Sequence, residues 1–232
     1  QMTDKTTTPE KALARIKDNS TLMIGGFGAP GTPFTLIREL IKQSPARLTL
    51  IKNDANEEGM GISLLFEAGC ADTFMVSHMG LNNRVITMMN EGKIHVQMFP
   101  QGIMAEKIRA GGAGIPAFLT DIGMGTILQE KRQTVSYAGG DYILEPALRA
   151  DFALIHAAEA DTFGNLGFSK TARNFNPLMA MAADTVIVEA FDIREQGSLD
   201  PDSIHLPGAF VDHVIRVDRR ENDYQVMKHH AL

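Results

Sequence analysis

Residues 18–33 read DNSTLMIGGFGAPGTP, and this stretch decides the fold. Within it, Thr21–Ile24 is a short apolar run that stops at two glycines, as a buried strand does. Pro33 then opens a segment, 34–41, in which apolar residues recur every three or four positions on one helical face. A strand, a glycine loop and a helix in this order predict the start of a β-α-β unit.

The same alternation continues along the chain to about residue 112. A short helix capped by Thr8, with Pro9 at its first position, is expected to end near Asp18. Further strands are expected at 47–54, 72–78 and 93–99, each followed by a helix, at 61–69, 82–92 and 102–112. The pattern predicts an α/β fold, a largely parallel, doubly wound sheet with helices on both faces and ligands at the carboxyl ends of its strands.

The second half of the chain has a different character. The glycine-rich residues 111–126 predict an ordered loop, and the turns at Gly139–Gly140 and Gly164–Asn165 predict two pairs of strands. A helix at 176–184 and a buried strand at 185–191 should follow. We expect these antiparallel strands to extend the parallel sheet within one domain, 1–232, with flexible ends at about 1–7 and 219–232.

Composition excludes several classes of protein. The 232 residues carry a net charge of −6 with no basic run, so a nucleic-acid partner is not expected. No apolar run reaches the length of a membrane span, and we expect a cytoplasmic protein. The single cysteine, Cys70, fits a buried residue in a reducing compartment. The histidines lack a metal-ligand spacing, so no metal site is expected; those considered are His78, His95, His156, His205 and His213.

The loop has two readings that involve a ligand and one that does not. Gly26 to Gly31 satisfies G-x-G-x-x-G, and Asp54 follows the next strand, about where a dinucleotide-binding fold places its ribose-binding acid. This pattern favours a nicotinamide-dependent oxidoreductase. Pro30 argues against it, because proline removes an N–H group that a pyrophosphate would use. The third reading is a tight turn in a non-catalytic scaffold.

The longer stretch resembles the signature of class I coenzyme A transferases. That signature has two polar positions, three apolar residues, Gly-Gly-Phe and then Gly-x-Pro, and each is matched between Asp18 and Pro33. Segments at 99–120, 164–166, 171–177 and 199–214 resemble the alpha subunit of the same family in chain order, so that the likeness covers nearly the whole chain.

The resemblance implies a ping-pong reaction through a glutamyl-CoA thioester. The nucleophilic glutamate belongs to a beta subunit, within a Ser-Glu-Asn-Gly-like segment that this chain lacks. The nearest strings, Glu57–Gly59 and Asn90–Gly92, are expected to be solvated loops. The chain should therefore be catalytically incomplete alone and should form an α2β2 assembly with the beta subunit. Acyl-CoA is then its substrate, and no permanent cofactor is implied.

The resemblance also assigns roles to residues. The loop implied to bind CoA comprises Gly25, Gly26, Phe27, Gly28, Ala29, Pro30 and Gly31. Their N–H groups and the positive end of the next helix should face the ligand, and Gly26→Val should block CoA transfer without unfolding the protein.

Two further residues are implied to support catalysis: Gln101, an amide donor beside the reacting carboxyl groups, and Asn53, a polar strand-end residue. Gly111–Pro116 should line a groove between subunits. Arg173 could face an anion or tie loops together, and Asp54, where many relatives have Asn, leaves the chemistry of the acid pocket open.

Overall fold

The computed structural model describes residues 3–217 and Tyr224. Its main sheet has the strand order β11-β10-β8-β1-β2-β3-β4, and all neighbours in this series are parallel. These strands are β1 (Thr21–Ile24), β2 (Leu48–Ile51), β3 (Ala71–Val76), β4 (His95–Met98), β8 (Ala150–Asp161), β10 (Ala183–Arg194) and β11 (His213–Arg216). A short strand, β9 (Leu166–Gly167), pairs antiparallel with β8. The predicted parallel α/β sheet is confirmed.

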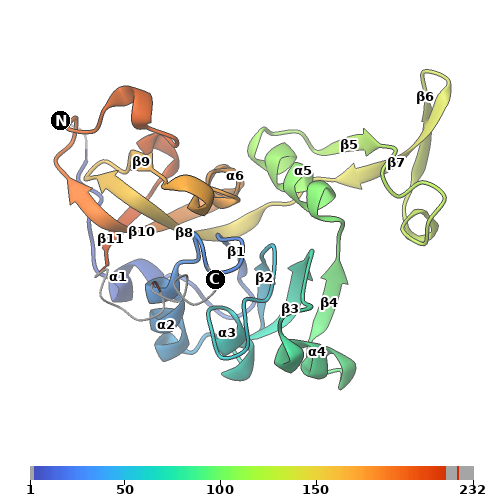
Figure 1. Cartoon of the computed structure of the whole chain (residues 1–232), viewed down its shortest axis with the longest axis horizontal. Coiled ribbons are helices and arrows are strands. Elements are labelled where there is room, and N and C mark those ends of the chain that lie inside the picture. The colour runs from blue at the N-terminus through green and yellow to red at the C-terminus, as the bar shows by residue number, and fades with distance from the viewer. Residues whose placement is uncertain (1–2, 218–223, 225–232) are drawn as a thin grey trace, which may run out of the picture.

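Helices cover both faces of this sheet, as predicted (Figure 1). One apolar cluster packs α1 (Pro9–Leu13), α2 (Phe34–Gln43), α3 (Ser63–Glu67) and α4 (Asn83–Asn90) against one face. A second cluster packs α5 (Gln101–Gly112) and α6 (Asn176–Met181) against the other. Four short 3-10 turns complete the described elements: η1 (Gln129–Lys131), η2 (Lys170–Ala172), η3 (Pro201–Ser203) and η4 (Gly208–Phe210).

The prediction that antiparallel strands extend the main sheet is wrong. The hairpin around Gly139–Gly140 exists, as β6 (Thr134–Tyr137) and β7 (Gly140–Pro146), but it joins β5 (Ala117–Thr120) in a separate three-stranded sheet. The later strands β8 and β10 are parallel to each other because the crossover between them contains a helix, α6. Residues 111–126 are likewise not one loop, since they contain the end of α5 and all of β5.

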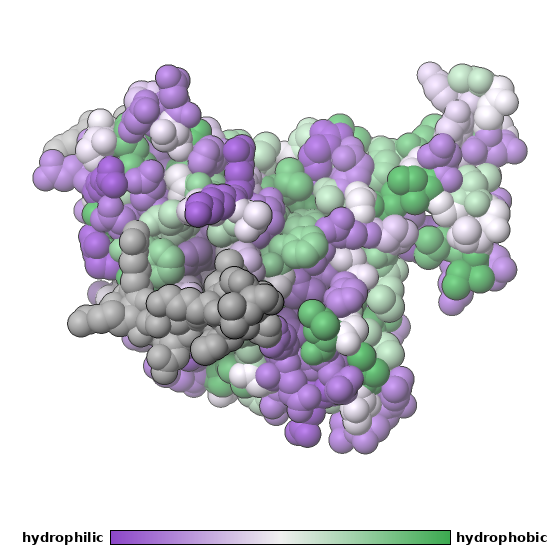
Figure 2. Space-filling view, in the orientation of Figure 1, coloured by the Kyte–Doolittle hydropathy of each residue, from purple (hydrophilic) through white to green (hydrophobic). Residues whose placement is uncertain are grey.

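The small sheet forms an arm that projects from the body of the molecule (Figure 1). A buried ion pair fastens the arm to α5, with Lys107 Nζ 2.7 Å from Glu145 Oε2. Apolar side chains gather on the arm surface (Figure 2), including Ile122, Ile127 and Tyr137, which are 53, 77 and 66% exposed. A surface of this kind is typical of a contact with another protein chain.

Near the chain ends the structure adds to the prediction. Residues 5–7, placed by prediction in a flexible end, lie against β11, where Thr7 N donates to Val214 O. Apart from Tyr224, the predicted flexible end at 219–232 lies outside the described residues. No helix among the described residues is long and apolar enough to cross a membrane. Cys70 is buried in the core, as predicted, and burial raises the pKa of its thiol.

Candidate active site

A cavity of about 510 Å³ opens at the carboxyl ends of β1, β2 and β3, beside the start of α5. It brings together three parts of the site predicted from the sequence, namely the glycine loop, Asn53 and Gln101. Its lining residues are Phe27, Gly28, Ala29, Asn53, Asp54, Ala55, Asn56, Glu57, Met60, Ser77, His78, Met79, Leu81 and Gln101. The strand-end location predicted for a ligand is therefore where the structure has a cavity.

The glycine loop is held from outside by a distant asparagine pair. Asn174 Nδ2 donates to Pro30 O at 2.9 Å, and Asn176 Nδ2 donates to Gly31 O at 3.1 Å. Asn176 Oδ1 in turn accepts from His156 N on β8 at 3.2 Å. Loop tying, which the sequence left open for Arg173, is thus done by its asparagine neighbours, while Arg173 itself is exposed.

Three of the loop glycines serve the fold itself. A Cβ atom on Gly25 would lie 1.8 Å from Asn176 Oδ1, and one on Gly26 would lie 2.3 Å from Thr32 Oγ1. Gly26 and Gly31 also have positive φ angles of 108° and 78°. The expectation that Gly26→Val would spare the fold is therefore wrong, because Gly26 makes room for the protein's own atoms.

Gly28 is different, because it lines the cavity and its surroundings are open. Its φ is 62°, and a Cβ there would meet only Pro30 Cδ, at 3.8 Å. Close backbone approach to a ligand, which the sequence predicts for the whole loop, is best supported at this position.

Only some of the loop N–H groups are available to a ligand. Gly25 N donates to Leu154 O, Phe27 N donates to Pro30 O, and Gly28 N donates to Asp54 Oδ2 at 2.7 Å. Among the described residues, no hydrogen-bond partner is found for the N–H groups of Gly26, Ala29 and Gly31. An oxyanion at the loop would therefore meet fewer donors than the glycine count suggests.

The start of α2 is not available to a ligand, contrary to the sequence-based expectation. Leu36 N donates to the buried carboxylate of Glu189 at 3.0 Å, and Thr35 N donates to the Tyr224 hydroxyl at 3.1 Å. Glu189 also lies 2.8 Å from His156 Nδ1 and accepts from Tyr224. Because a carboxylate from β10 already interacts with the positive end of the helix, α2 contributes structure here and not ligand binding.

Asn53 is fixed by hydrogen bonds on both sides of its amide. Its Nδ2 donates to Asp54 Oδ2 at 3.0 Å, and its Oδ1 accepts from the Ser77 hydroxyl at 2.9 Å. Since an amide nitrogen carries two hydrogens, one remains after the bond to Asp54. Ser77 is a site residue that the sequence did not single out, although it lies at the end of a predicted strand.

Gln101 is the first residue of α5 and is exposed. The helix has no side-chain cap at its N-cap residue, Pro100, so that its first N–H groups stay open beside the cavity. The Gln101 amide has no hydrogen-bond partner among the described residues, which leaves its donors free for a ligand.

Two carboxylates line the cavity, and they differ in environment. Burial by itself raises the pKa of Asp54, but Lys52 and hydrogen bonds from Gly28, Asn53 and Asn56 outweigh burial and hold the pKa below its ordinary value of 3.8. Glu57 is half-buried and lines the cavity, which differs from the solvated loop expected for it.

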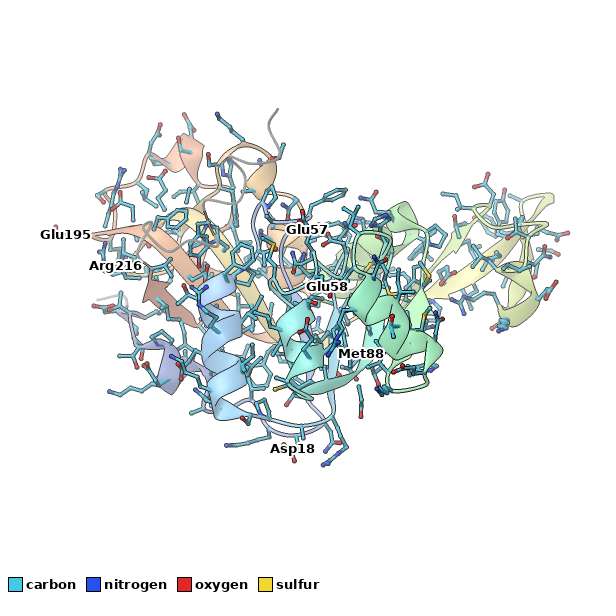
Figure 3. The ribbon with its side chains drawn as sticks, turned by 60° about the horizontal axis from the view of Figure 1, so that its bottom comes forward. Asp18, Glu57, Glu58, Met88, Glu195 and Arg216 are labelled. Atoms are coloured by element: carbon cyan, nitrogen blue, oxygen red, sulfur yellow. The ribbon has the colours of Figure 1, made fainter. Side chains whose placement is uncertain are left out.

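The other loop carboxylates agree with expectation. Glu58 is exposed, and Figure 3 shows both Glu57 and Glu58 at the end of the molecule opposite Asp18, which precedes β1. Glu91 is exposed and pairs with Lys93 at 2.7 Å. No group of three metal-ligating side chains occurs within 3–217.

Comparison with known proteins decides how this site is to be interpreted. The family model described as coenzyme A transferase matches residues 6–216. The chain belongs to the coenzyme A transferase family. It is 42% identical over 212 residues to the A subunit of a succinyl-CoA:3-ketoacid coenzyme A transferase from Helicobacter pylori, with 91% of each chain covered. It is 43% identical to the alpha subunit of the acetate CoA-transferase of Escherichia coli K12, covering 92% of this chain and 97% of that protein.

Solved structures share the fold of this CoA-transferase chain. An acyl-CoA transferase from Escherichia coli O157:H7, in a thioester complex with CoA, superposes with a TM-score of 0.84 at 24% identity. That match covers 91% of this chain but only 47% of the longer protein, so this chain spans about half of that one. Glutaconate coenzyme A-transferase from Acidaminococcus fermentans gives a TM-score of 0.82 at 19% identity, covering 93 and 76% of the two chains.

Membership of the CoA-transferase family resolves the alternatives that the loop left open. The chain is an alpha-type subunit of a CoA-transferase, and the dinucleotide reading of G-x-G-x-x-G is not adopted. The glycine stretch 111–116 has a simpler explanation than a subunit groove at its first residue. A Cβ on Gly111 would lie 1.9 Å from Leu148 O, so this glycine lets α5 pack against its own chain.

Proposed function

We propose that this chain supplies the substrate-binding wall of a two-subunit CoA-transferase whose attacking glutamate lies on the beta subunit. The cavity itself carries the proposal. It offers amide donors from Asn53 and Gln101, while its most buried carboxylate, Asp54, accepts hydrogen bonds on both oxygens. A carboxylate held in this way is a poor nucleophile, so the attacking group has to come from elsewhere.

The reaction then proceeds in two exchanges. A glutamate of the beta subunit first displaces the CoA thiolate from the thioester carbonyl of the acyl-CoA, leaving an acyl-glutamyl anhydride. The thiolate attacks the glutamyl carbonyl of the anhydride, which forms the glutamyl-CoA thioester and releases the first carboxylic acid. The acceptor acid repeats the sequence in reverse and leaves as its CoA thioester.

This chain stabilises the negative charge that develops in those steps. Each attack forms a tetrahedral oxyanion, and preorganised N–H donors around such an oxyanion are worth about 10²–10³ in rate per donor. The Gln101 amide, the second hydrogen of Asn53 Nδ2 and the free N–H of Ala29 are the donors we assign to this role. Gly28 provides the close backbone approach for acyl-CoA.

Two observations support a separate partner. The chain spans about half of a single-chain acyl-CoA transferase, so another half is needed to match that enzyme. The arm carries the exposed apolar residues Ile122, Ile127 and Tyr137, a surface suited to contact with a second chain. We propose the arm as part of that contact and α2β2 as the assembly, in the cytoplasm.

The cavity lining favours a short monocarboxylic acid. Met60, Met79 and Leu81 provide an apolar wall, and Asp54 and Glu57 are acidic. No lysine or arginine is among the described lining residues, so this wall offers no cation to a second carboxylate. We therefore propose acetate, acetoacetate or butyrate in preference to succinate.

The test begins with the full chain co-purified with its beta subunit. Incubation with acyl-CoA followed by borohydride reduces a glutamyl thioester, and peptide mass mapping locates the modified residue. We expect the label on the beta subunit; a label on this chain would refute the division of roles. Transfer rates with acetate, acetoacetate and butyrate should exceed the rate with succinate, and the reverse order would refute the acid preference.

A further inference from the structure

Lys52 is the least expected residue near the cavity. It follows β2 directly, its side chain is fully buried, and its ammonium nitrogen is buried without a hydrogen-bond partner in the described structure. The nearest opposite charge is Asp54 Oδ1, at 3.5 Å. A buried ammonium that makes no hydrogen bond is costly unless its charge itself has a use.

Asp54 connects three parts of the active site. Its Oδ2 accepts from Gly28 N in the glycine loop and from Asn53 Nδ2, and its Oδ1 accepts from Asn56 N at 2.9 Å. The same carboxylate lines the cavity. An ionised Asp54 therefore fixes the donors of the site, but it also places a negative charge where an anionic acid has to bind.

We propose that Lys52 and Asp54 form a charge-compensating pair that positions the glycine loop and Asn53 while allowing a carboxylate substrate to lie against Asp54. The carboxylate organises the donors, and the ammonium behind it offsets its repulsion of the substrate. Both are positioning residues. The kinetic part rests on the function proposed above, whereas the structural part does not.

Other charged groups near Asp54 do not replace Lys52. His78 pairs with Asp54 through the backbone and lines the cavity together with Glu57, which adds negative charge. Burial raises the pKa of an Asp54 that has lost its neighbouring ammonium, while the Gly28, Asn53 and Asn56 hydrogen bonds still favour the ionised form. Such an Asp54 should be neutral at low pH and charged at high pH.

A double-variant cycle in thermal unfolding of the full chain tests the pair directly. Lys52→Met leaves a buried anion without a counter-charge, and Asp54→Asn leaves a buried cation. The double variant, Lys52→Met with Asp54→Asn, removes both charges. We expect each single variant to lower Tm and the double variant to lose less than the sum of the two. Strictly additive losses would overturn the pairing.

Kinetics of the complex with the beta subunit test the effect on the substrate. For Lys52→Met, the KM of the acceptor acid should rise about tenfold at pH 8 and less at pH 6, since a like charge at ion-pair distance gives at least that factor. The double variant should return the KM toward wild type with no added pH dependence. This rescue cannot come from a purely structural lysine.

Lys107→Met is the matched control, because Lys107 is also a buried lysine paired with a carboxylate, Glu145, but lies outside the cavity lining. It should lower Tm without changing the pH profile of the acid KM. Equal acid KM values for Lys52→Met and Lys107→Met at every pH would overturn the role in substrate binding. If the wild-type complex transfers CoA to no acid, the proposed function fails, and the unfolding cycle still decides the pair.

Discussion

Gly26→Ala should destabilise the protein strongly although it adds one methyl group. The new Cβ would lie 2.3 Å from Thr32 Oγ1 and 2.8 Å from Thr32 N, and the second contact is to backbone that cannot rotate away. A non-glycine residue held at such a φ costs about 1–3 kcal/mol, and relieving the contact brings the total to roughly 3 kcal/mol. For a chain of this size that is a fall in Tm of about 6–12 °C.

Gly28→Ala is the matched control in the same loop. Its φ of 62° is one that alanine adopts at a cost of about 1–2 kcal/mol, and its Cβ meets no atom closer than 3.8 Å. We expect a fall in Tm of about 2–8 °C but a clear loss of kcat/KM for acyl-CoA, because the methyl group enters the cavity. Circular dichroism melts and transfer assays with the beta subunit measure both. A Gly26→Ala melt within about one degree of wild type would refute the argument.

Gln101, Asn176 and Asp54 each give a further prediction. Gln101→Ala should lower kcat about 10²-fold with little change in the KM for acyl-CoA, since its amide is assigned to the transition state; a change in KM alone would contradict that role. Asn176→Ala should cost about 2–4 kcal/mol in chemical denaturation, because Gly31 O and the buried His156 N each lose a partner; a loss under about 0.5 kcal/mol would show that the loop is held otherwise. Because the pKa of Asp54 is lower in the folded protein than its ordinary 3.8, its stabilisation is complete above that pH and is lost as the pH falls further. The Tm advantage of wild type over the Lys52→Met/Asp54→Asn variant should accordingly shrink below about pH 4, and a constant difference would contradict it.

Local sequence determined much of this protein. Periods of two and of three to four residues, broken by glycines and prolines, were enough to predict the β-α-β units up to residue 112 and their parallel order. Strand-end polar residues then pointed to the cavity, because the carboxyl ends of parallel strands meet at one edge. Asn53 and Gln101 were located in this way, and the signature at 18–33 led to the family.

Only the tertiary structure decided which distant groups meet. Asn176 reaches the glycine loop from 145 residues away, Glu189 occupies the start of α2, and the 134–146 hairpin pairs with β5 in place of the main sheet. Periodicity describes which face of an element is apolar but not which element covers it. The role of Gly26, a turn residue crowded by Thr32, and the isolation of Lys52 beside Asp54 depend on contacts that the order of residues alone does not specify.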